Sequence, residues 1–393
     1  MTGSAPASQR DVDAPPVRLL VDDSAGFNQG AGIGRYARNI LPALAAAWPR
    51  LDLTLFYAPA TAGPAPFADV ALHGLPPETR VRRAPFSRRR ADQLWFRARL
   101  PLPVQALAGR ADLVYSPDFT VPPAGRAPRA LTLHDLAFLV APERVPAPLR
   151  AYLAAAVPRL VAGAALVAVV SETTRRDAIE RLRVPAERIA LVPNGVAARF
   201  FDPPPLTGAQ RAKLGLPADY LLTVGTLEPR KNHATLFAAL RHLAGRVDLP
   251  LVVAGRRGWQ DEPILSAAEP LVRSGRVVLL DYVPDALLPG LYAGAAAVVY
   301  PSWYEGFGLP LLEALAAGVP TVASTAPALR EIGGEAALYA APDDPAAIAD
   351  AIAQALTTAQ HKPAARAARQ DRARRYDWAG AGAALATALR RLV

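Results

Sequence analysis

The segment that most constrains the fold runs from Tyr300 to Ser324 and carries two carboxylates in apolar surroundings. Its pattern predicts a buried strand, a loop, a helix over Leu309–Ala317, a turn and a second strand. The helix is apolar on nearly every face, so we expect it to be buried, yet it carries Glu313. Burying a charge is costly unless polar groups meet it. This helix therefore indicates either a core glutamate with polar partners or a ligand site.

The second carboxylate, Glu305, lies in the loop before this helix and is followed by Gly306, Phe307 and Gly308. The first N–H groups of a helix lack partners within the helix and favour negative charge. Backbone N–H groups suit an anion, and two carboxylates suit hydroxyl groups. The simpler alternative is an ordinary glycine turn ahead of a core helix.

The length and the alternation of elements predict two domains. A chain of 393 residues exceeds one typical core, and three consecutive prolines at 203–205 mark a boundary. Strands alternate with helices in both halves, which predicts an α/β fold with parallel sheets covered by helices. We predict a disordered tail over 1–16, a first domain over 17–197 plus 377–393, and a second over 198–376.

Charge and composition restrict the partners. The net charge of +10 suits a polyanion such as nucleic acid, anionic lipid or a phosphorylated ligand. The chain has no cysteine, which excludes disulfides and thiolate metal sites. The region Arg88–Arg99 mixes arginines with Trp95 and Phe96, which fits an anionic membrane surface. The alternative is a solvated basic face whose aromatic side chains lie in the core.

A glycine-rich loop follows the first predicted strand, Val17–Asp22. It contains Gly32 and Gly34 in the spacing G-x-G-x-G, eight residues beyond the strand. A dinucleotide-binding loop follows its strand directly with the spacing G-x-G-x-x-G, so this loop argues against NAD. It fits either a backbone that approaches a ligand closely or a plain turn.

Two further strand ends carry polar groups. Gly225 and Thr226 follow the strand at 220–224, and Arg230 and Lys231 precede the next helix. Arginine offers a planar fork and lysine a point charge, so this segment predicts a diphosphate clamp, unless it is an exposed basic turn. His134 ends another strand, at the edge where open α/β sheets bind ligands, although a histidine there is often structural.

Three stretches together resemble the retaining glycosyltransferases of family 4: GFGLPLLEALAAGVPTVAS, GTLEPRKN and GAGIGRYARN. The similarity extends from about Val17 to Val393. The resemblance implies the GT-B architecture, in which two Rossmann-like domains face each other across a cleft. It implies a nucleotide-sugar donor, a glycan or lipid-linked acceptor, and no cofactor or metal. We expect no nucleic acid partner and a cytoplasmic location, with peripheral contact to the inner face of the membrane through Arg88–Arg99.

The resemblance also implies roles for individual residues. It assigns catalytic roles to Glu305, Arg230, Lys231 and His134. Donor contacts are implied for a larger set: Gly32, Gly34, Gly225, Thr226, Val283, Gly306, Phe307, Gly308, Leu309 and Glu313. In this scheme Glu305 faces the donor sugar, Glu313 accepts from ribose hydroxyls, and Val283 borders the base.

Alternatives remain for the identity of the donor and for the class of reaction. GTLEPRKN together with LHDL resembles mannosyltransferases of polysaccharide assembly, which favours GDP-mannose. UDP-glucose and UDP-N-acetylglucosamine are the alternative donors. A GT-B nucleotide-sugar 2-epimerase, an NAD oxidoreductase and a non-catalytic polyanion-binding protein are the alternative classes.

Overall fold

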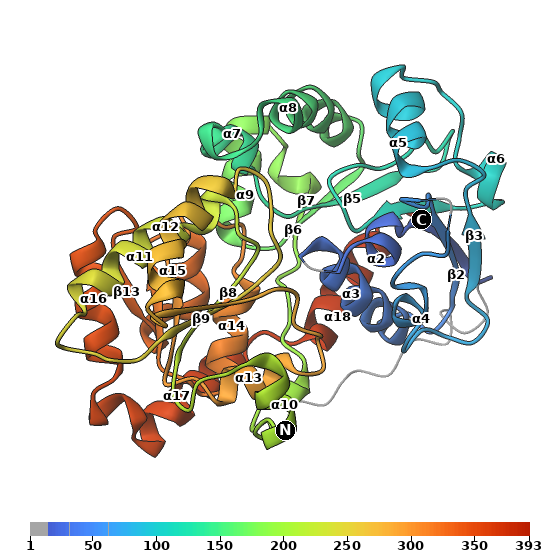
Figure 1. The fold of residues 1–393 in the computed structure, drawn as a ribbon. Helices are drawn as coiled ribbons and strands as arrows, with labels where there is room; N and C mark the ends of the chain where they lie inside the picture. The colour runs from blue at the N-terminus through green and yellow to red at the C-terminus, as the bar shows by residue number, and fades with distance from the viewer. Residues whose placement is uncertain (1–14, 31, 62) are drawn as a thin grey trace.

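Two parallel sheets form the framework of the molecule (Figure 1). This computed structural model describes residues 15–30, 32–61 and 63–393, so most of the predicted tail lies outside the described residues. The first sheet has seven strands in the order β3-β2-β1-β4-β5-β6-β7, and the second has six in the order β10-β9-β8-β11-β12-β13. The predicted α/β class is confirmed.

The first sheet and its helices are built from the amino-terminal half. Its strands are β1 (Val17–Asp22), β2 (Leu51–Tyr57), β3 (Arg80–Arg83), β4 (Leu113–Ser116), β5 (Arg129–Leu133), β6 (Leu166–Val169) and β7 (Ile189–Leu191). Its α-helices are α2 (Ser24–Asn28), α3 (Ile33–Ala47), α4 (Ala68–Ala71), α5 (Arg88–Ala91), α6 (Gln105–Ala108), α7 (Ala137–Val140), α8 (Ala147–Ala162) and α9 (Glu172–Leu182). The strands β4 and β6 are buried along their whole length, as expected for a parallel sheet covered on both faces.

The second sheet follows in the same manner. Its strands are β8 (Leu221–Val224), β9 (Leu251–Ala254), β10 (Val277–Leu280), β11 (Ala297–Tyr300), β12 (Thr321–Ser324) and β13 (Leu338–Ala340). Its helices are α10 (Gly208–Leu214), α11 (His233–His242), α12 (Glu262–Arg273), α13 (Leu288–Ala293), α14 (Leu309–Ala316), α15 (Pro327–Gly333), α16 (Pro345–Ala355) and α17 (Pro363–Ala373). The helix predicted within Tyr300–Ser324 is α14, and six of its eight residues are buried.

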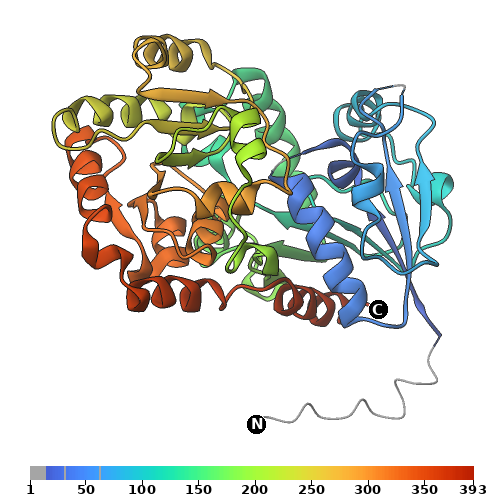
Figure 2. The same cartoon turned by 60° about the horizontal axis from the view of Figure 1, so that its bottom comes forward.

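The last helix, α18 (Trp378–Arg390), returns to the first half and runs beside α3 (Figure 2). A Cβ atom at Gly382 would collide with the backbone of Ala43, so glycine permits this close approach. Leu385 and Leu389 are fully buried in the same core. The helix therefore lies with the first sheet although it follows the second in sequence. The boundaries of the two predicted domains stay a prediction.

In each sheet the strand order reverses between two adjacent central strands, which are β1 and β4 in the first and β8 and β11 in the second. Loops diverge at such a point, and ligands of open α/β folds bind beyond the carboxyl ends of the strands there. A cleft of about 540 Å³ lies between the halves, and both contribute to its lining. The fold thus places loops from both sheets around one space.

In the arginine-rich region Arg88–Arg99, the two aromatic side chains are buried. Trp95 and Phe96 lie in a six-residue π-helix (Asp92–Arg97) and are only 5% and 4% exposed. Trp95 packs near Phe56 and donates from Nε1 to the Leu102 carbonyl at 3.0 Å. The aromatic side chains thus belong to the core, which was the alternative interpretation. Contact of the region Arg88–Arg99 with a membrane stays a prediction, and the two buried rings are not available for it.

Candidate active site

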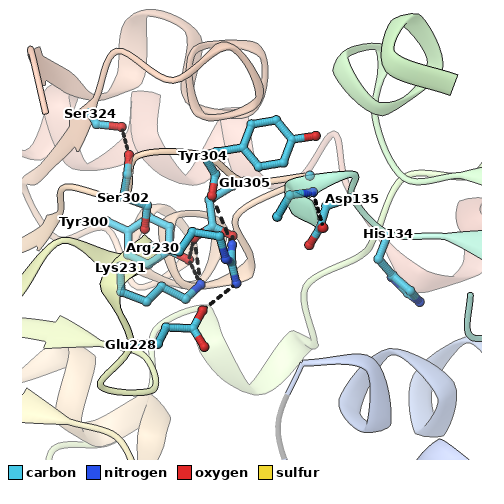
Figure 3. A network of polar contacts seen from close by, with 12 residues as sticks. His134, Asp135, Glu228, Arg230, Lys231, Tyr300, Ser302, Tyr304, Glu305 and Ser324 are labelled. Atoms are coloured by element: carbon cyan, nitrogen blue, oxygen red, sulfur yellow. Dashed lines mark hydrogen bonds and ion pairs between the residues drawn. The ribbon is translucent and has the colours of Figure 1, made fainter. Parts of the chain in front are cut away.

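Glu305 is the centre of a polar network in the loop between β11 and α14 (Figure 3). Its Oε1 accepts from Lys231 Nζ at 2.7 Å and from the Tyr300 hydroxyl at 2.9 Å. Its Oε2 accepts from Arg230 Nη1 at 2.7 Å. Burial alone would raise the pKa of Glu305, but the charges of Arg230 and Lys231 lower it to about 2. Glu305 is therefore an ionised carboxylate with three donors.

Arg230 and Lys231 occupy a short 3₁₀ turn, Pro229–Lys231, at the end of β8. The turn ends at Asn232, whose backbone is left-handed with φ of 63° and whose side-chain amide donates to the carbonyls of Pro301 and Pro342. Those bonds tie the turn to the loop that carries Glu305. Sequence analysis predicted these residues separately, and the structure brings them together.

The network is electrically balanced. Arg230 Nη2 also pairs with Glu228 Oε1 at 2.8 Å, so two cations face two carboxylates. An anion that binds here therefore has to share both cations with Glu228 and Glu305. Additional positive potential comes from the start of α14, where no described side chain caps the first N–H groups. The site can hold an anion through both features.

The glycine loop before α14 fits closely against the first half. A Cβ atom at Gly306 would collide with the carbonyl oxygen of His134. The Gly306 carbonyl accepts from Ser171 Oγ at 2.5 Å and from Thr174 Oγ1 at 3.2 Å, both in the first half. Gly308 is left-handed with φ of 102°, a conformation that favours glycine. The loop is thus held between the two halves and needs both glycines.

His134 follows β5 and lines the same cleft as Glu305. Its Nε2 lies 2.9 Å from the carbonyl oxygen of Pro117. A carbonyl can only accept, so the proton lies on Nε2 and Nδ1 is left as an acceptor. Burial lowers the pKa of His134, which keeps the ring neutral at pH 7. A neutral imidazole in this position can orient a hydroxyl group.

Glu313 has partners that sequence analysis missed. It is 2% exposed, accepts from the Tyr292 hydroxyl at 3.0 Å, and forms an ion pair with Arg35 of the first half. Arg35 also lies 3.8 Å from Asp285. Arg35 directly follows the last glycine of GAGIG, but nothing in that stretch indicates Glu313 as its partner. The charge of Glu313 is satisfied within the protein, as in the core interpretation, and its partner Arg35 lines a hollow beside the cleft. A contact between Glu313 and a ligand stays a prediction.

This hollow, of about 390 Å³, contains Gly225, Thr226 and Val283 from the predicted donor set, together with Arg35 and Asp285. Most of the remaining predicted residues line the main cleft: Gly32, His134, Thr226, Arg230, Lys231, Glu305, Gly306, Phe307, Gly308 and Leu309. Of the predicted residues within the described part of the chain, Gly34 and Glu313 line neither. Gly34 packs inside the α2–α3 contact, where a Cβ atom would collide with the Gln29 carbonyl. A ligand can reach Glu313 only if Arg35 moves.

The ion pair between Arg35 and Glu313 predicts a measurable coupling in stability. Replacing Arg35 with methionine leaves Glu313 buried without its cation, and we expect a loss of about 3–5 kcal/mol in the free energy of unfolding. The double variant Arg35→Met/Glu313→Gln should recover part of that loss. Denaturant titration measures both variants.

A matched control is Arg18→Met, which breaks the exposed pair with Asp112 and should have a much smaller effect. The coupling would be contradicted if the loss in free energy of unfolding of the double variant equalled the sum of the losses for Arg35→Met and Glu313→Gln alone.

Two features of the described part of the chain concern metals and membranes. No group of three or more histidine and acidic side chains could hold a metal ion. No described helix is both long enough and apolar enough to cross a bilayer. Independence from metal stays a prediction.

Comparisons with known proteins agree with this architecture. Residues 30–200 match the family model described as Glycosyltransferase Family 4, and residues 218–358 match the one described as Glycosyl transferases group 1. The chain is 33% identical over 366 residues to O-antigen chain mannosyltransferase B of Escherichia coli, covering 88% of this chain and 92% of that protein.

Solved structures share the fold. Sucrose-phosphate synthase from Thermosynechococcus elongatus superimposes with a TM-score of 0.72 at 22% identity, covering 96% of this chain and 99% of that one. Anabaena Alr3699/HepE, solved in complex with UDP and glucose, has a TM-score of 0.69 at 19% identity, covering 95% of this chain and all of that one.

Two parallel sheets with a cleft between them define the GT-B fold of glycosyltransferases. Since similarity to the mannosyltransferase covers most of both chains, the protein described here belongs to glycosyltransferase family 4.

Proposed function

We propose that this protein transfers mannose from GDP-mannose to a glycan or lipid-linked acceptor in the synthesis of a cell-surface polysaccharide or glycolipid. The observation that carries the proposal is the network of Glu305, Arg230 and Lys231 in the interdomain cleft. The 33% identity to an O-antigen mannosyltransferase favours mannose over glucose and supports transfer rather than 2-epimerisation.

The proposed reaction retains the configuration at the anomeric carbon. The bond between C1 of the sugar and the β-phosphate oxygen breaks, and negative charge accumulates on the diphosphate. Arg230, Lys231 and the N–H groups at the start of α14 are placed to stabilise that charge. The acceptor hydroxyl forms the new bond to C1 on the same face and gives its proton to the leaving phosphate oxygen.

Glu305 serves this reaction as an acceptor for sugar hydroxyls rather than as a nucleophile. Its two oxygens already receive three hydrogen bonds, and its pKa is lowered to about 2. Both effects reduce the nucleophilicity of a carboxylate. The same charge fixes Arg230 and Lys231 in position for the diphosphate, which gives the residue a second role.

The hollow that contains Val283 favours guanine as the base. Asp285 brings a carboxylate to its lining, and Val224 and Leu288 contribute apolar surface. Guanine presents two neighbouring N–H groups on one edge, which one carboxylate can accept together. The corresponding ring edge of uracil presents a single N–H group. The lining therefore supports a GDP-linked donor over a UDP-linked one.

Thermal unfolding with a panel of nucleotide sugars tests the donor. A ligand at about 100 times its Kd adds about 2.7 kcal/mol to the stability of the native state. We expect GDP-mannose to raise the unfolding midpoint more than UDP-glucose or UDP-N-acetylglucosamine, with EDTA present throughout. Asp285→Asn should reduce the difference between the unfolding midpoints with GDP-mannose and with the UDP-sugars. A larger shift with either UDP-sugar would contradict the choice of donor.

We also propose peripheral contact with an anionic membrane through exposed arginines of the first half. Arg88 does not serve this role, because it pairs with Asp92 at 3.2 Å and lies 3.9 Å from both Asp22 and Asp118. Its neighbours Arg89 and Arg90 are exposed. Each arginine near an anionic surface contributes about 1 kcal/mol to binding.

Co-sedimentation with phosphatidylglycerol vesicles tests this contact. Arg89→Gln/Arg90→Gln should lower the bound fraction, whereas the control Arg273→Gln/Arg374→Gln removes the same charge from the second half and should not. Equal losses in both variants would show a general charge effect and contradict a specific surface.

A further inference from the structure

A third hollow lies outside the cleft, at the edge of the second sheet's helices. It has a volume of about 700 Å³, within the usual range of roughly 300–1,000 Å³ for small-molecule sites. The starts of α11 and α12 form much of its lining, together with Trp303 from the Glu305 loop and Arg144 from the first half. None of the roles assigned above uses this space.

The outer hollow and the cleft share a wall. The Arg144 guanidinium lies 3.9 Å from the centre of the Trp303 ring. The backbone carbonyl of Arg144 accepts a hydrogen bond from Trp259 Nε1 at 3.4 Å. Val145 and Trp259 line the cleft, whereas their sequence neighbours Arg144 and Gln260 line the outer hollow. A chain whose end lies in the cleft therefore reaches the outer hollow by crossing this contact.

Hydrogen-bond donors in the outer hollow come from the start of α11. No described side chain caps this helix, so the N–H groups of its first turn are available. His233 is only 1% exposed, and its Nδ1 has no hydrogen-bond partner among the described residues. Burial lowers the pKa of His233 to about 4, so the ring is neutral at pH 7. A buried polar nitrogen without a partner among the described residues is a group that a polar ligand in this hollow can satisfy.

Acceptors come from the start of α12. Glu262 adds a carboxylate, Asp261 adds a second one that also accepts from Arg257, and Gln260 adds an amide that can both donate and accept. The Trp303 indole contributes an apolar aromatic surface to the same lining. A pyranose needs this combination, because its hydroxyls both donate and accept while its C–H groups pack on aromatic rings. The lining carries two carboxylates against one guanidinium, that of Arg144, which disfavours an anionic ligand.

We propose that the outer hollow is a subsite for a neutral hexose of the acceptor, one or more sugars away from the hydroxyl that reacts in the cleft. The proposal rests on the proposed transferase function and adds to it: the acceptor is an oligosaccharide chain that extends across the Arg144 contact. The subsite predicts that the protein prefers longer acceptors.

Acceptor length gives the test, with methyl α-mannoside and a linear α-linked mannotetraose as acceptors and GDP-mannose as donor. Ala234→Phe introduces a bulky ring into the outer hollow from the exposed second position of α11. We expect it to lower the ratio of kcat/KM for tetraose over methyl mannoside about tenfold, or 1.4 kcal/mol. The control is Ala364→Phe, at the exposed second position of α17, which should keep the ratio.

A second variant and a binding measurement separate the outcomes. Gln260→Gly removes the amide without strain, because Gln260 has φ of 53°, and should lower the same ratio. Calorimetry measures mannotetraose binding without donor. Binding of mannotetraose to the wild type but not to Ala234→Phe supports the subsite, whether or not transfer is detected. Absence of transfer would refute only the proposed function. Transfer with an unaltered length ratio in both variants would overturn the subsite and leave the proposed function standing.

Discussion

Replacing Glu305 with glutamine should lower kcat for hexose transfer by at least about a hundredfold, the usual cost of removing one electrostatic contact from a reaction centre. Glutamine has nearly the shape of glutamate but brings an NH₂ group toward Lys231 and Arg230, which both donate. The cations then lose their common acceptor and their fixed position beside the cleft. Steady-state kinetics at saturating donor measures the effect.

The choice of glutamine matters because of burial. Glu305 is 6% exposed, and removing one partner of a buried ion pair costs about 3–5 kcal/mol of stability. Circular dichroism and GDP binding should show that the variant is folded before its rate is interpreted. Glu335→Gln, an exposed carboxylate elsewhere in the second half, should have wild-type activity. A folded Glu305→Gln protein with wild-type turnover would refute the assignment of the site.

Lys231→Ala should weaken the binding of GDP by about ten- to a hundredfold, since a hydrogen bond to a charged group contributes about 1.5–3 kcal/mol. Lys231 Nζ lies 2.7 Å from Glu305 and 2.8 Å from the Tyr300 hydroxyl, so its position is fixed before the ligand arrives. Isothermal titration calorimetry at constant salt measures the Kd directly.

A suitable control is Lys213→Ala, which removes an exposed lysine from α10 and keeps the change in net charge the same. If both variants bind GDP as tightly as the wild type, the diphosphate clamp is wrong. If both weaken binding equally, the effect comes from overall charge and the specific role of Lys231 is again refuted.

Features that depend on neighbouring residues were predictable from the sequence. The helix expected over Leu309–Ala317 is α14, Leu309–Ala316, because a continuous apolar run after two glycines fixes its start and its burial. The buried strand expected before the loop of Glu305 is β11, Ala297–Tyr300. The position of Arg230 and Lys231 beside a strand end and a helix start was predictable, because glycine, cations and a helix start follow one another within a few positions. Their role as a clamp stays a prediction.

Features that depend on distant partners were not predictable. Glu313 pairs with Arg35, which lies 278 residues away, and no local pattern selects that partner. Arg88 was assigned to a membrane surface with its neighbours, yet three carboxylates from separate segments surround it. Trp303 and Arg144 meet across the two halves in the same manner. The sequence shows that a charge or ring is present, but only folding selects its partner.

The most direct test of the account is transfer from GDP-mannose labelled with ¹³C at C1, followed by NMR with a mannoside acceptor and EDTA. We expect GDP to be released and the label to appear in an α-linked product, with the configuration of the donor retained. A β-linked product would contradict retention. Absence of transfer from GDP-mannose, together with transfer from a UDP-sugar under the same conditions, would contradict the assigned donor.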